Sequence, residues 1–554
     1  MSVRTQEPGA RLRRGLRVFC FFLLLLAAGR TALADCRLLA DIGPAGAYGL
    51  ADGSGQTTHG CRLDQPMVPA SIIKIATVVA ALRILGPEYR FPTQFSVDDG
   101  DNLYIRGFGD PTLTSEAVAA MAVRLRQLGL TRVRTLFVDG SAFDLSGLTP
   151  GQAGSDNPYD APVGPLSVNF NAVPLERHPS GRITPGEAQT PFLPIMAQMG
   201  RTRPAGRHRL NVCAGGCDPA TRVARYSGEL FRAQLEAAGV TVAGLGGLRP
   251  TPAGARPLAT LHSAQTLTAM SRSLLHYSTN FTANLVFLAC GAQRFGYPAT
   301  WDKARRAVAE SLGSQLGASA RAIVQVDGAG LSRDNRVTAR AMLGLLEVFR
   351  PHRDLLPRDR HGWIKTGTLT GVANGAGYLA DGRAYVLFLT QPASRRAMLT
   401  GTGAAFAALF AASRTGQTMA QGHHGIPLYG PLRKDPQALL DLPEGFTYRV
   451  ISRMGDAMDD RGTVPDRADG MGCFALPRGR IALVRNHELK PGDHAGGNLQ
   501  AGYDRHLAGA VLPGGTTTLV LDPATLTVER QFRSLAGTIR SRSGMCQTCG
   551  VVSS

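Results

Sequence analysis

The chain has 554 residues, of which 44 % are hydrophobic and 18 % are charged, and its formal net charge is +19 at pH 7. This length allows several domains, and the composition excludes a small disulfide scaffold, a collagen-like repeat and a long coiled coil. The basic charge favours polyanionic surroundings such as anionic lipid or an acidic wall polymer. Nucleic acid is not expected as a partner, because the sequence has no dense basic run with interleaved aromatic residues.

Lysine is rare in this basic chain. Lys and Arg together number 60, and the lysines are Lys74, Lys303, Lys365, Lys434 and Lys490. Lysine can lose its proton and acts as a compact point charge, whereas arginine stays protonated. Because most basic positions of this chain are arginines, each lysine suggests a site that needs a titratable amine. Chance retention is the alternative for any single lysine.

The first 34 residues have the pattern of an export signal. Arginines between Arg11 and Arg17 precede an apolar run at 18–28, and Ala32-Leu33-Ala34 fits a signal-peptidase site. The apolar run is short for a bilayer span, and no later stretch reaches the ~20 apolar residues that a span requires. We expect a mature chain that begins at Asp35 in a bacterial periplasm, without a stable membrane span. An uncleaved anchor is the alternative.

The cysteines fit an oxidising compartment. By proximity, Cys36 with Cys61 and Cys213 with Cys217 are candidate disulfide pairs, although the sequence does not fix the connectivity. No histidine or second cysteine pair accompanies Cys213 and Cys217, so zinc is not expected there. No metal and no cofactor are predicted for this protein.

Residue patterns divide the chain into parts. The run at 70–85 follows Pro69, is apolar nearly throughout and predicts a buried helix that starts near Ser71. Short β-rich runs between Gly- and Pro-rich turns predict an inserted β-rich region at 91–260. Helical periodicity returns from Thr266 and again at 338–349.

The later part of the chain contains a hairpin signal. Two apolar-rich runs, 375–380 and 383–390, flank Asp381-Gly382, a strong turn sequence. Residues 414–430 are typical of a linker, and a segment rich in Gly, Pro and Asp follows. The expected parts are a signal peptide (1–34), an α/β (α+β) catalytic domain (35–90 with 261–413), the insertion (91–260), the linker (414–430) and a partial β-rich C-terminal segment (431–554).

Three short motifs could carry chemistry: Ser71-Ile72-Ile73-Lys74, Ser278-Thr279-Asn280 and Lys365-Thr366-Gly367. Residues i and i+3 of a helix share a face, so a neutral Lys74 amine could take the proton of Ser71. This spacing predicts Ser71 as the nucleophile and Lys74 as its base. Ser278, in a turn between helices, is predicted to relay a proton, and Asn280 to hold a substrate amide.

The third motif precedes the predicted hairpin and can lie on a sheet edge, where an extended peptide adds as a strand. Gly367 would permit close approach, and Lys365 and Thr366 would offer donors to a carboxylate. The N–H groups of Ser71 and Thr368 are predicted to form an oxyanion hole. Each motif alone is more often an ordinary helix serine or surface lysine. Their order and contexts together predict acyl transfer.

Ser-x-x-Lys, Ser-x-Asn and Lys-Thr-Gly form the signature of penicillin-binding proteins and class A β-lactamases. Around these motifs, from about residue 36 to 412, the chain resembles the D-alanyl-D-alanine carboxypeptidase family, which comprises low-molecular-mass penicillin-binding proteins with an inserted region. The matching stretches are VPASIIKIAT (68–77), LYIRGFGDPTLT (103–114), YDAPVGPLSVNFNAV (159–173), HYSTNFTANLV (276–286), DGAGLSRDNRVTARAM (327–342) and IKTGTLTGVANGAGYL (364–379).

The resemblance implies a β-lactamase/transpeptidase-like catalytic domain that removes the terminal D-Ala of peptidoglycan stem peptides through a Ser71 acyl-enzyme. Cleavage of peptide cross-links is a further expected activity, and β-lactam antibiotics are expected to acylate the same serine. A β-lactamase is the first alternative, although the spacing from Ser71 to Ser278 is much longer than that of a class A enzyme.

The C-terminal segment has a second resemblance. Residues 432–476 and LVRNHEL (483–489) are similar to the start of PhoX-type alkaline phosphatases, which depend on calcium and iron. Glu488 could be one metal ligand in that pattern, but a surface carboxylate is the favoured alternative. The resemblance ends near residues 537–540, and Cys546-x-x-Cys549 then needs no redox role. A metal-dependent phosphatase whose N-terminal part only binds wall polymer is the second alternative.

Overall fold

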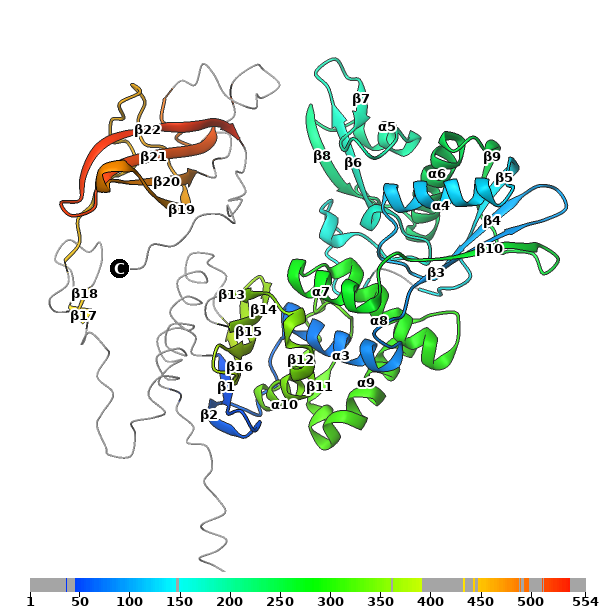
Figure 1. Ribbon diagram of the computed structural model, residues 1–554, viewed down its shortest axis with the longest axis horizontal. Helices are drawn as coiled ribbons and strands as arrows, with labels where there is room; N and C mark the ends of the chain where they lie inside the picture. The colour runs from blue at the N-terminus through cyan, green and yellow to red at the C-terminus, as the bar shows by residue number, and fades with distance from the viewer. Residues whose placement is uncertain are drawn as a thin grey trace, which may run out of the picture. The chain divides into compact units, whose positions relative to one another are not determined.

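The computed structural model describes Cys36, 45–145, 149–359 and 362–390, and then 432–433, 442–443, 447–487, 489, 493–497, 511 and 513–538. The predicted signal peptide, residues 391–413, the linker at 414–430, Glu488 and Cys546-x-x-Cys549 lie outside these residues. The chain forms two compact units (Figure 1). The first holds most of the chain up to Gln417, and the second holds the chain from Thr418 onward.

A six-stranded sheet in the order β13-β14-β15-β16-β1-β2 carries one part of the first unit. Its strands are β1 (Ala47–Ala51), β2 (Thr57–Cys61), β13 (Arg358–Asp359), β14 (Gly362–Leu369), β15 (Val372–Leu379) and β16 (Ala384–Thr390). All neighbouring strands are antiparallel. The hairpin predicted around Asp381-Gly382 is confirmed as β15–β16, and Gly382 has φ 87° in its turn.

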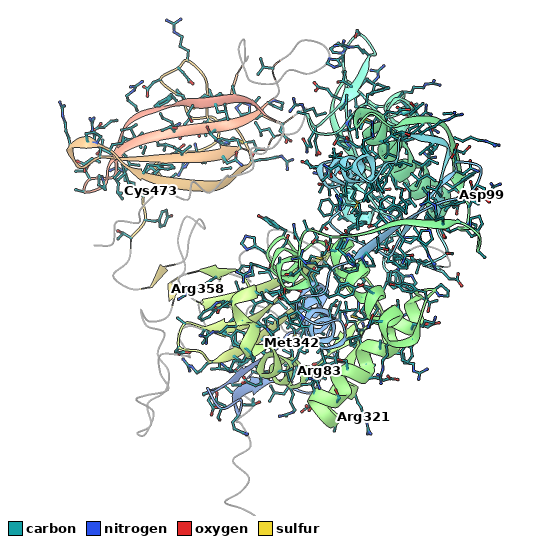
Figure 2. The ribbon with its side chains drawn as sticks, turned by 45° about the vertical axis from the view of Figure 1, so that its right-hand side comes forward. Arg83, Asp99, Arg321, Met342, Arg358 and Cys473 are labelled. Carbon is teal, nitrogen blue, oxygen red and sulfur yellow. A yellow bond between two sulfur atoms is a disulfide. The ribbon has the colours of Figure 1, made fainter. Side chains whose placement is uncertain are left out.

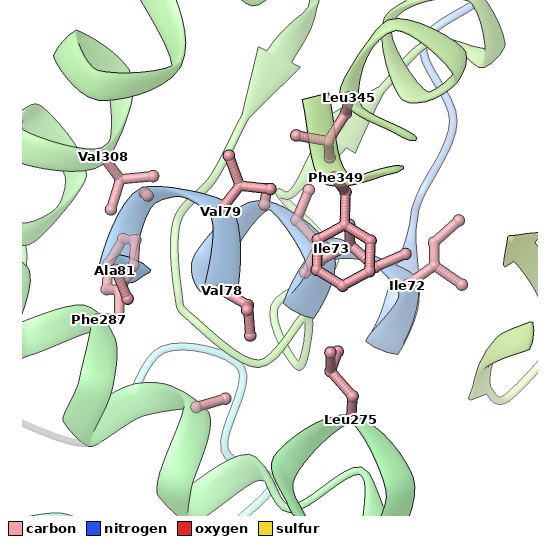
Figure 3. Packing of buried hydrophobic residues seen from close by; sticks show 14 of the residues in the cluster. Ile72, Ile73, Val78, Val79, Ala81, Leu275, Phe287, Val308, Leu345 and Phe349 are labelled. Carbon is pink, nitrogen blue, oxygen red and sulfur yellow. The ribbon is translucent and has the colours of Figure 1, made fainter. Parts of the chain in front are cut away.

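Helices pack beside this sheet around one buried element, α3. The elements are η1 (Ala70–Ile73), α3 (Lys74–Ile84), α7 (Leu267–Tyr277), α8 (Asn280–Phe295), α9 (Trp301–Leu316), η4 (Gly317–Ala322), β11 (Ile323–Val324), β12 (Arg336–Val337), α10 (Ala339–Phe349) and η5 (Arg350–Leu355). Every residue of α3 from Lys74 to Leu82 is buried, as expected of a helix that is apolar on all sides. Figure 3 shows side chains of neighbouring helices, among them Leu275 and Phe287, around it.

The predicted helix at 70–85 differs from the structure in its first turn. Residues 70–73 form a 3₁₀ turn, and the α-helix begins only at Lys74. Ala70 has φ 49°, in the left-handed region, so the chain enters the helix through a tight turn rather than a regular cap. Ser71 therefore precedes the α-helix instead of starting it.

The inserted region has its own sheet and its own hydrophobic core. The sheet order is β10-β3-β4-β5-β9, from β3 (Pro92–Val97), β4 (Leu103–Gly107), β5 (Arg132–Asp139), β9 (Thr241–Leu248) and β10 (Arg256–His262). A smaller sheet, β7-β6-β8, contains β6 (Ala172–Arg177), β7 (Ile183–Pro185) and β8 (Gly206–Asn211). The remaining elements are α4 (Ser115–Gln127), η2 (Pro158–Asp160), η3 (Asn169–Asn171), α5 (Pro194–Gly200) and α6 (Pro219–Ala237).

This region is less purely β than its turn-rich sequence suggested. The pairs β4–β5 and β5–β9 are parallel, and parallel neighbours need a crossover connection, which is usually a helix. The helices α4 and α6 lie in these two crossovers. The strand content of the prediction is confirmed, and the helical content was missed.

Both candidate disulfides are present. Cys36 is bonded to Cys61, and Cys213 to Cys217. The first bond ties the beginning of the described chain to β2, the strand at one edge of the six-stranded sheet. Cys290 is a free, buried cysteine, and Cys473 is free and exposed on β19 of the second unit (Figure 2).

The second unit contains a four-stranded antiparallel sheet in the order β19-β20-β21-β22. Its elements are β17 (Leu432–Arg433), β18 (Leu442–Pro443), β19 (Ala468–Ala475), η7 (Pro477–Gly479), β20 (Ile481–His487), β21 (Gly514–Asp522) and β22 (Thr527–Thr538). Polar residues are prominent among its buried side chains, including Arg485, His487 and Thr517. In the described part of the chain, no helix is both long and apolar enough to cross a membrane.

Candidate active site

The first motif is held in place by the six-stranded sheet. Asn374 on β15 donates from Nδ2 to the carbonyls of Val68 and Pro69, at 2.8 Å each, and so fixes the segment that leads into η1. On β14, a Cβ added to Gly367 would lie 2.8 Å from the backbone nitrogen of Ser71. Only a residue without a side chain allows this approach of β14 to the Ser71 turn. The close approach of a substrate peptide that was expected at Gly367 stays a prediction.

The amine of Lys74 is fully buried and has three oxygen neighbours. Its Nζ lies 2.8 Å from Ser71 Oγ, 2.9 Å from Asn280 Oδ1 and 2.6 Å from the Ala329 carbonyl oxygen. A neutral amine has two N–H donors and one lone pair, so it can donate to Asn280 and Ala329 while it accepts from the Ser71 hydroxyl.

Electrostatics favour this neutral form. Burial is the main cause that holds the pKa of Lys74 well below its usual value, and the positive charge of Lys365 lowers it further. The negative charge of Asp327 acts in the opposite direction. Lys74 thus combines the contact and the lowered pKa that a general base for a serine requires.

The second motif occupies the junction of α7 and α8. Ser278 follows the last residue of α7 with φ 57°, and Asn280 is the first residue of α8. The sharp turn sends the two side chains to different lysines: Asn280 Oδ1 accepts from Lys74, and Ser278 Oγ lies 2.8 Å from Lys365 Nζ. The predicted position of the motif between helices is confirmed. Its roles in proton relay and amide binding remain predictions.

The third motif lies on β14, as expected of an edge strand. Among the described residues, β13 pairs only with Gly362 and Trp363, which leaves the outer edge of β14 unpaired from Lys365 onward. Thr366 and Thr368 are exposed, whereas Lys365 is only 2 % exposed. Burial lowers the pKa of Lys365 to about 8, so the amine is still mainly an ammonium at neutral pH and loses its proton as the pH rises through that value.

These contacts bring the three motifs into one neighbourhood. Ser71, Lys74 and Asn280 meet at one amine, Lys365 meets Ser278, and Gly367 brings β14 against the Ser71 turn. The predicted oxyanion hole of Ser71 and Thr368 N–H groups fits this approach but stays a prediction.

Sequence reasoning missed two contributors, Asn374 and the loop from Asp327 to Asn335. Both lie in stretches that carry the family resemblance. Asn374 stands in an otherwise apolar and glycine-rich run, and Asp327 directly precedes Gly328-Ala329-Gly330. That contrast was an available signal. Among the described residues, no group of three or more His, Cys, Asp or Glu side chains is placed to hold a metal ion.

A serine in contact with a buried lysine, a Ser-x-Asn turn and a Lys-Thr-Gly strand on this fold define the penicillin-recognising serine enzymes. The chain matches the D-Ala-D-Ala carboxypeptidase 3 (S13) family over residues 50–203 and 219–357, which is just over half of its length. It belongs to that family.

Individual relatives agree with this assignment. The chain is 30 % identical over 328 residues to a D-alanyl-D-alanine carboxypeptidase of Actinomadura sp. (strain R39), an alignment that covers 51 % of this chain and 60 % of the relative. It is 24 % identical over 391 residues to D-alanyl-D-alanine carboxypeptidase DacB of Haemophilus influenzae, covering 58 % and 80 % of the two chains. The chain thus spans less than two thirds of the Actinomadura relative.

A solved structure shares the fold. Penicillin binding protein 4 (dacB) of Haemophilus influenzae superposes with a TM-score of 0.55 at 20 % sequence identity, covering 68 % of this chain and 98 % of that one. The same protein in complex with a β-lactam gives a TM-score of 0.52. The second resemblance also has a counterpart, because residues 427–535 match the family of the alkaline phosphatase PhoX.

Proposed function

We propose that this protein is an exported serine-type D-Ala-D-Ala carboxypeptidase. Its substrates would be peptidoglycan stem peptides in the periplasm, with endopeptidase cleavage of cross-links as a second activity. The observation that carries the proposal is the 2.8 Å contact between Ser71 Oγ and the buried amine of Lys74, whose pKa is lowered. Export rests on the signal pattern of residues 1–34.

In the proposed acylation step, Ser71 Oγ attacks the carbonyl carbon of the penultimate D-Ala. Its proton moves to Lys74 Nζ, and the C–N bond to the terminal D-Ala breaks. Ser278, whose Oγ lies 2.8 Å from Lys365 Nζ, would relay this proton from the Lys74 ammonium to the leaving amine nitrogen, so that Lys74 is neutral again. In deacylation, Lys74 would take a proton from the water that attacks the ester carbon and return it to the Ser71 oxygen. A β-lactam would enter the same first step through its ring amide.

Substrate recognition would use the open edge of β14. A peptide can add there as an extended strand, with the Thr368 N–H and the Ser71 N–H facing its reacting carbonyl oxygen. Lys365 and Thr366 would receive the terminal carboxylate, and Asn280 Nδ2 would hold a backbone carbonyl of the substrate. The buried ammonium of Lys365 suits this task because a partly desolvated charge attracts a carboxylate strongly.

The test is to incubate the full-length protein with a peptide ending in D-Ala-D-Ala and to quantify released D-Ala, with Ser71→Ala as the control. We expect release by the wild type and none by the variant. Rapid turnover of a chromogenic cephalosporin would instead support the β-lactamase alternative. Phosphomonoester hydrolysis that persists in Ser71→Ala and is lost on chelation would support the phosphatase alternative.

A further inference from the structure

The loop between β11 and β12 surrounds a buried carboxylate that none of the three motifs includes. Asp327 is fully buried. Its Oδ1 accepts from the backbone N–H groups of Ala329 (2.7 Å), Gly330 (2.6 Å) and Leu331 (3.2 Å). Its Oδ2 accepts from Ser332 N–H (2.7 Å) and from Asn335 Nδ2 (3.0 Å). These five partners are donors, which suits an ionised carboxylate, and none of them is a cation.

The carboxylate organises a loop that contacts the nucleophile turn directly. The carbonyl of Ala329, two residues beyond Asp327, accepts from Lys74 Nζ at 2.6 Å. The carbonyl of Gly328 accepts from Thr77 Oγ1 at 2.7 Å, about one turn further along α3. Gly330, at φ 80°, lies so close to the nucleophile turn that an added Cβ would be 2.0 Å from the Ala70 carbonyl oxygen. Asp327 therefore fixes both the loop and its oxygen contact with Lys74.

We propose that Asp327 is a positioning and charge-balancing residue for Lys74: it holds the Ala329 carbonyl on the amine and stabilises the ammonium that forms when Ser71 gives up its proton. This inference rests on the proposed roles of Ser71 and Lys74. A buried ammonium without a nearby negative charge would be costly, and Asp327 supplies that charge without touching the substrate.

The proposed stabilisation of the Lys74 ammonium by Asp327 agrees with the charges that shift the pKa of Lys74. Burial and the charge of Lys365 lower that pKa, and Asp327 is the group that raises it. Other charged side chains near the loop are Arg305 on α9, which donates to the Val326 carbonyl at 3.0 Å and pairs with Asp302, and residues 333, 334 and 336 of the loop itself. All of these stay the same in the variants below, so they cannot produce a difference between them.

The test is the pH dependence of acylation of the full-length protein by a fluorescent penicillin. Loss of the negative charge in Asp327→Asn lowers the pKa of Lys74, because the ammonium loses its stabilising neighbour. The acidic limb of the rate profile should move to lower pH by about one unit. The plateau rate should fall about tenfold or more, because a weaker base takes the Ser71 proton. The alkaline limb, set by Lys365, should not move.

Matched variants separate charge from loop order. Asp327→Glu keeps the charge and should keep the acidic limb at the wild-type pH, even if the plateau falls. Asn335→Ala removes a hydrogen bond to Asp327 and the bond from Val326 N–H to Asn335 Oδ1 (2.7 Å), but leaves the charge. It should lower the plateau without moving the limb. If Asp327→Asn does not fold, Asp327→Ser supplies an uncharged acceptor for the same measurement.

An unshifted acidic limb in the uncharged Asp327 variant would overturn the inference while leaving the proposed function intact. An identical shift in Asn335→Ala would also overturn it, because loop order alone would then account for the effect. A wild type that penicillin does not acylate at all would overturn the proposed function together with this inference.

Discussion

Lys74 Nζ lies 2.8 Å from Ser71 Oγ although the two residues belong to different helical elements, the 3₁₀ turn η1 and the first turn of α3. In a 3₁₀ helix, residues i and i+3 are nearly eclipsed, whereas an α-helix offsets them. The 3₁₀ turn thus brings the hydroxyl more directly over the amine than the predicted α-helix would.

Replacing Lys74 by arginine should abolish most of the acylation. Arginine keeps a positive charge near Ser71 but cannot accept its proton, so the general-base contribution is lost. We expect the penicillin acylation rate of Lys74→Arg to fall about 10³-fold. The rate is measured by quenching the labelling reaction at set times, at a pH where the acylation rate of the wild type no longer depends on pH. Acylation at close to the wild-type rate in a folded Lys74→Arg protein would eliminate Lys74 as the base.

Lys365 should give kcat/KM an alkaline limb. Its pKa of about 8 means that the ammonium, which attracts the substrate carboxylate, is present below that pH and is lost as the pH rises through it. For a peptide with a free terminal carboxylate, kcat/KM should therefore fall above about pH 8, and this limb should vanish in Lys365→Arg, because arginine does not titrate there.

Replacing Lys365 by alanine should lower kcat/KM for substrates with a free terminal carboxylate. We expect kcat/KM for the free-carboxylate peptide to drop about 10²-fold, on the scale of one lost electrostatic contact in a transition state. An amidated peptide should lose much less. An equal loss for both peptides would argue against carboxylate recognition by Lys365.

Gly367→Ala should disable the site without unfolding the protein. The added Cβ would meet backbone atoms of the nucleophile turn, at 2.8 Å from Ser71 N and 2.9 Å from the Pro69 carbonyl oxygen, so the turn must shift away from β14. A shift of about 1 Å at reacting atoms can cost about 10²-fold in rate, and we expect that loss in acylation.

Gly313→Ala is the control for the glycine replacement. Gly313 lies in the interior of α9, and an added Cβ there meets nothing within 4 Å. This variant should acylate normally and gain about 0.5–1 kcal/mol in unfolding free energy, because alanine is the better helix former. Normal acylation by Gly367→Ala would show that the close approach of β14 to Ser71 is not needed.

The C-terminal segment should be dispensable for acylation. The S13 match ends at residue 357 and the PhoX match covers 427–535, so the two resemblances occupy separate parts of the chain. The three hydrophobic clusters formed by the described residues all lie in the first unit. A chain ending near Gly416 should keep its acylation rate and its thermal midpoint, and limited proteolysis of the full chain should cut first within 414–430.

Two results would contradict this interpretation of the segment: loss of acylation on truncation, or cooperative melting of the isolated segment together with phosphomonoester hydrolysis in added calcium and iron. The first result would show that the peptidase needs residues 431–554, and the second that these residues fold and act on their own.

Local signals in the sequence were sufficient for much of the fold and site. Residues close together in the sequence determine the turn at Asp381-Gly382 and the contact between Ser71 and Lys74. Both predictions agree with the structure. Helix α4 also had a local signal, since Val118, Met121, Ala122 and Leu125 follow a helical period and are buried. It was missed because turn-rich strands dominate the sequence around it.

For other features, nothing in the sequence identified the partner of the contact. Asn374 holds the segment before η1 through carbonyls more than 300 positions earlier in the chain, and the Ala329 carbonyl reaches Lys74 across 255 positions. Contacts between a side chain and a distant backbone leave no periodicity in the sequence. The 3₁₀ turn at Ser71 is imposed in the same way, by β14 and by the loop at Gly330 that press against it.

The most direct test of the account is to treat the full-length protein with penicillin and to locate the adduct by intact mass and peptide mapping. The account predicts one penicilloyl group per chain, on the peptide that contains Ser71, and no adduct in Ser71→Ala. An unlabelled wild type, an adduct on a different residue or equal labelling of Ser71→Ala would contradict it.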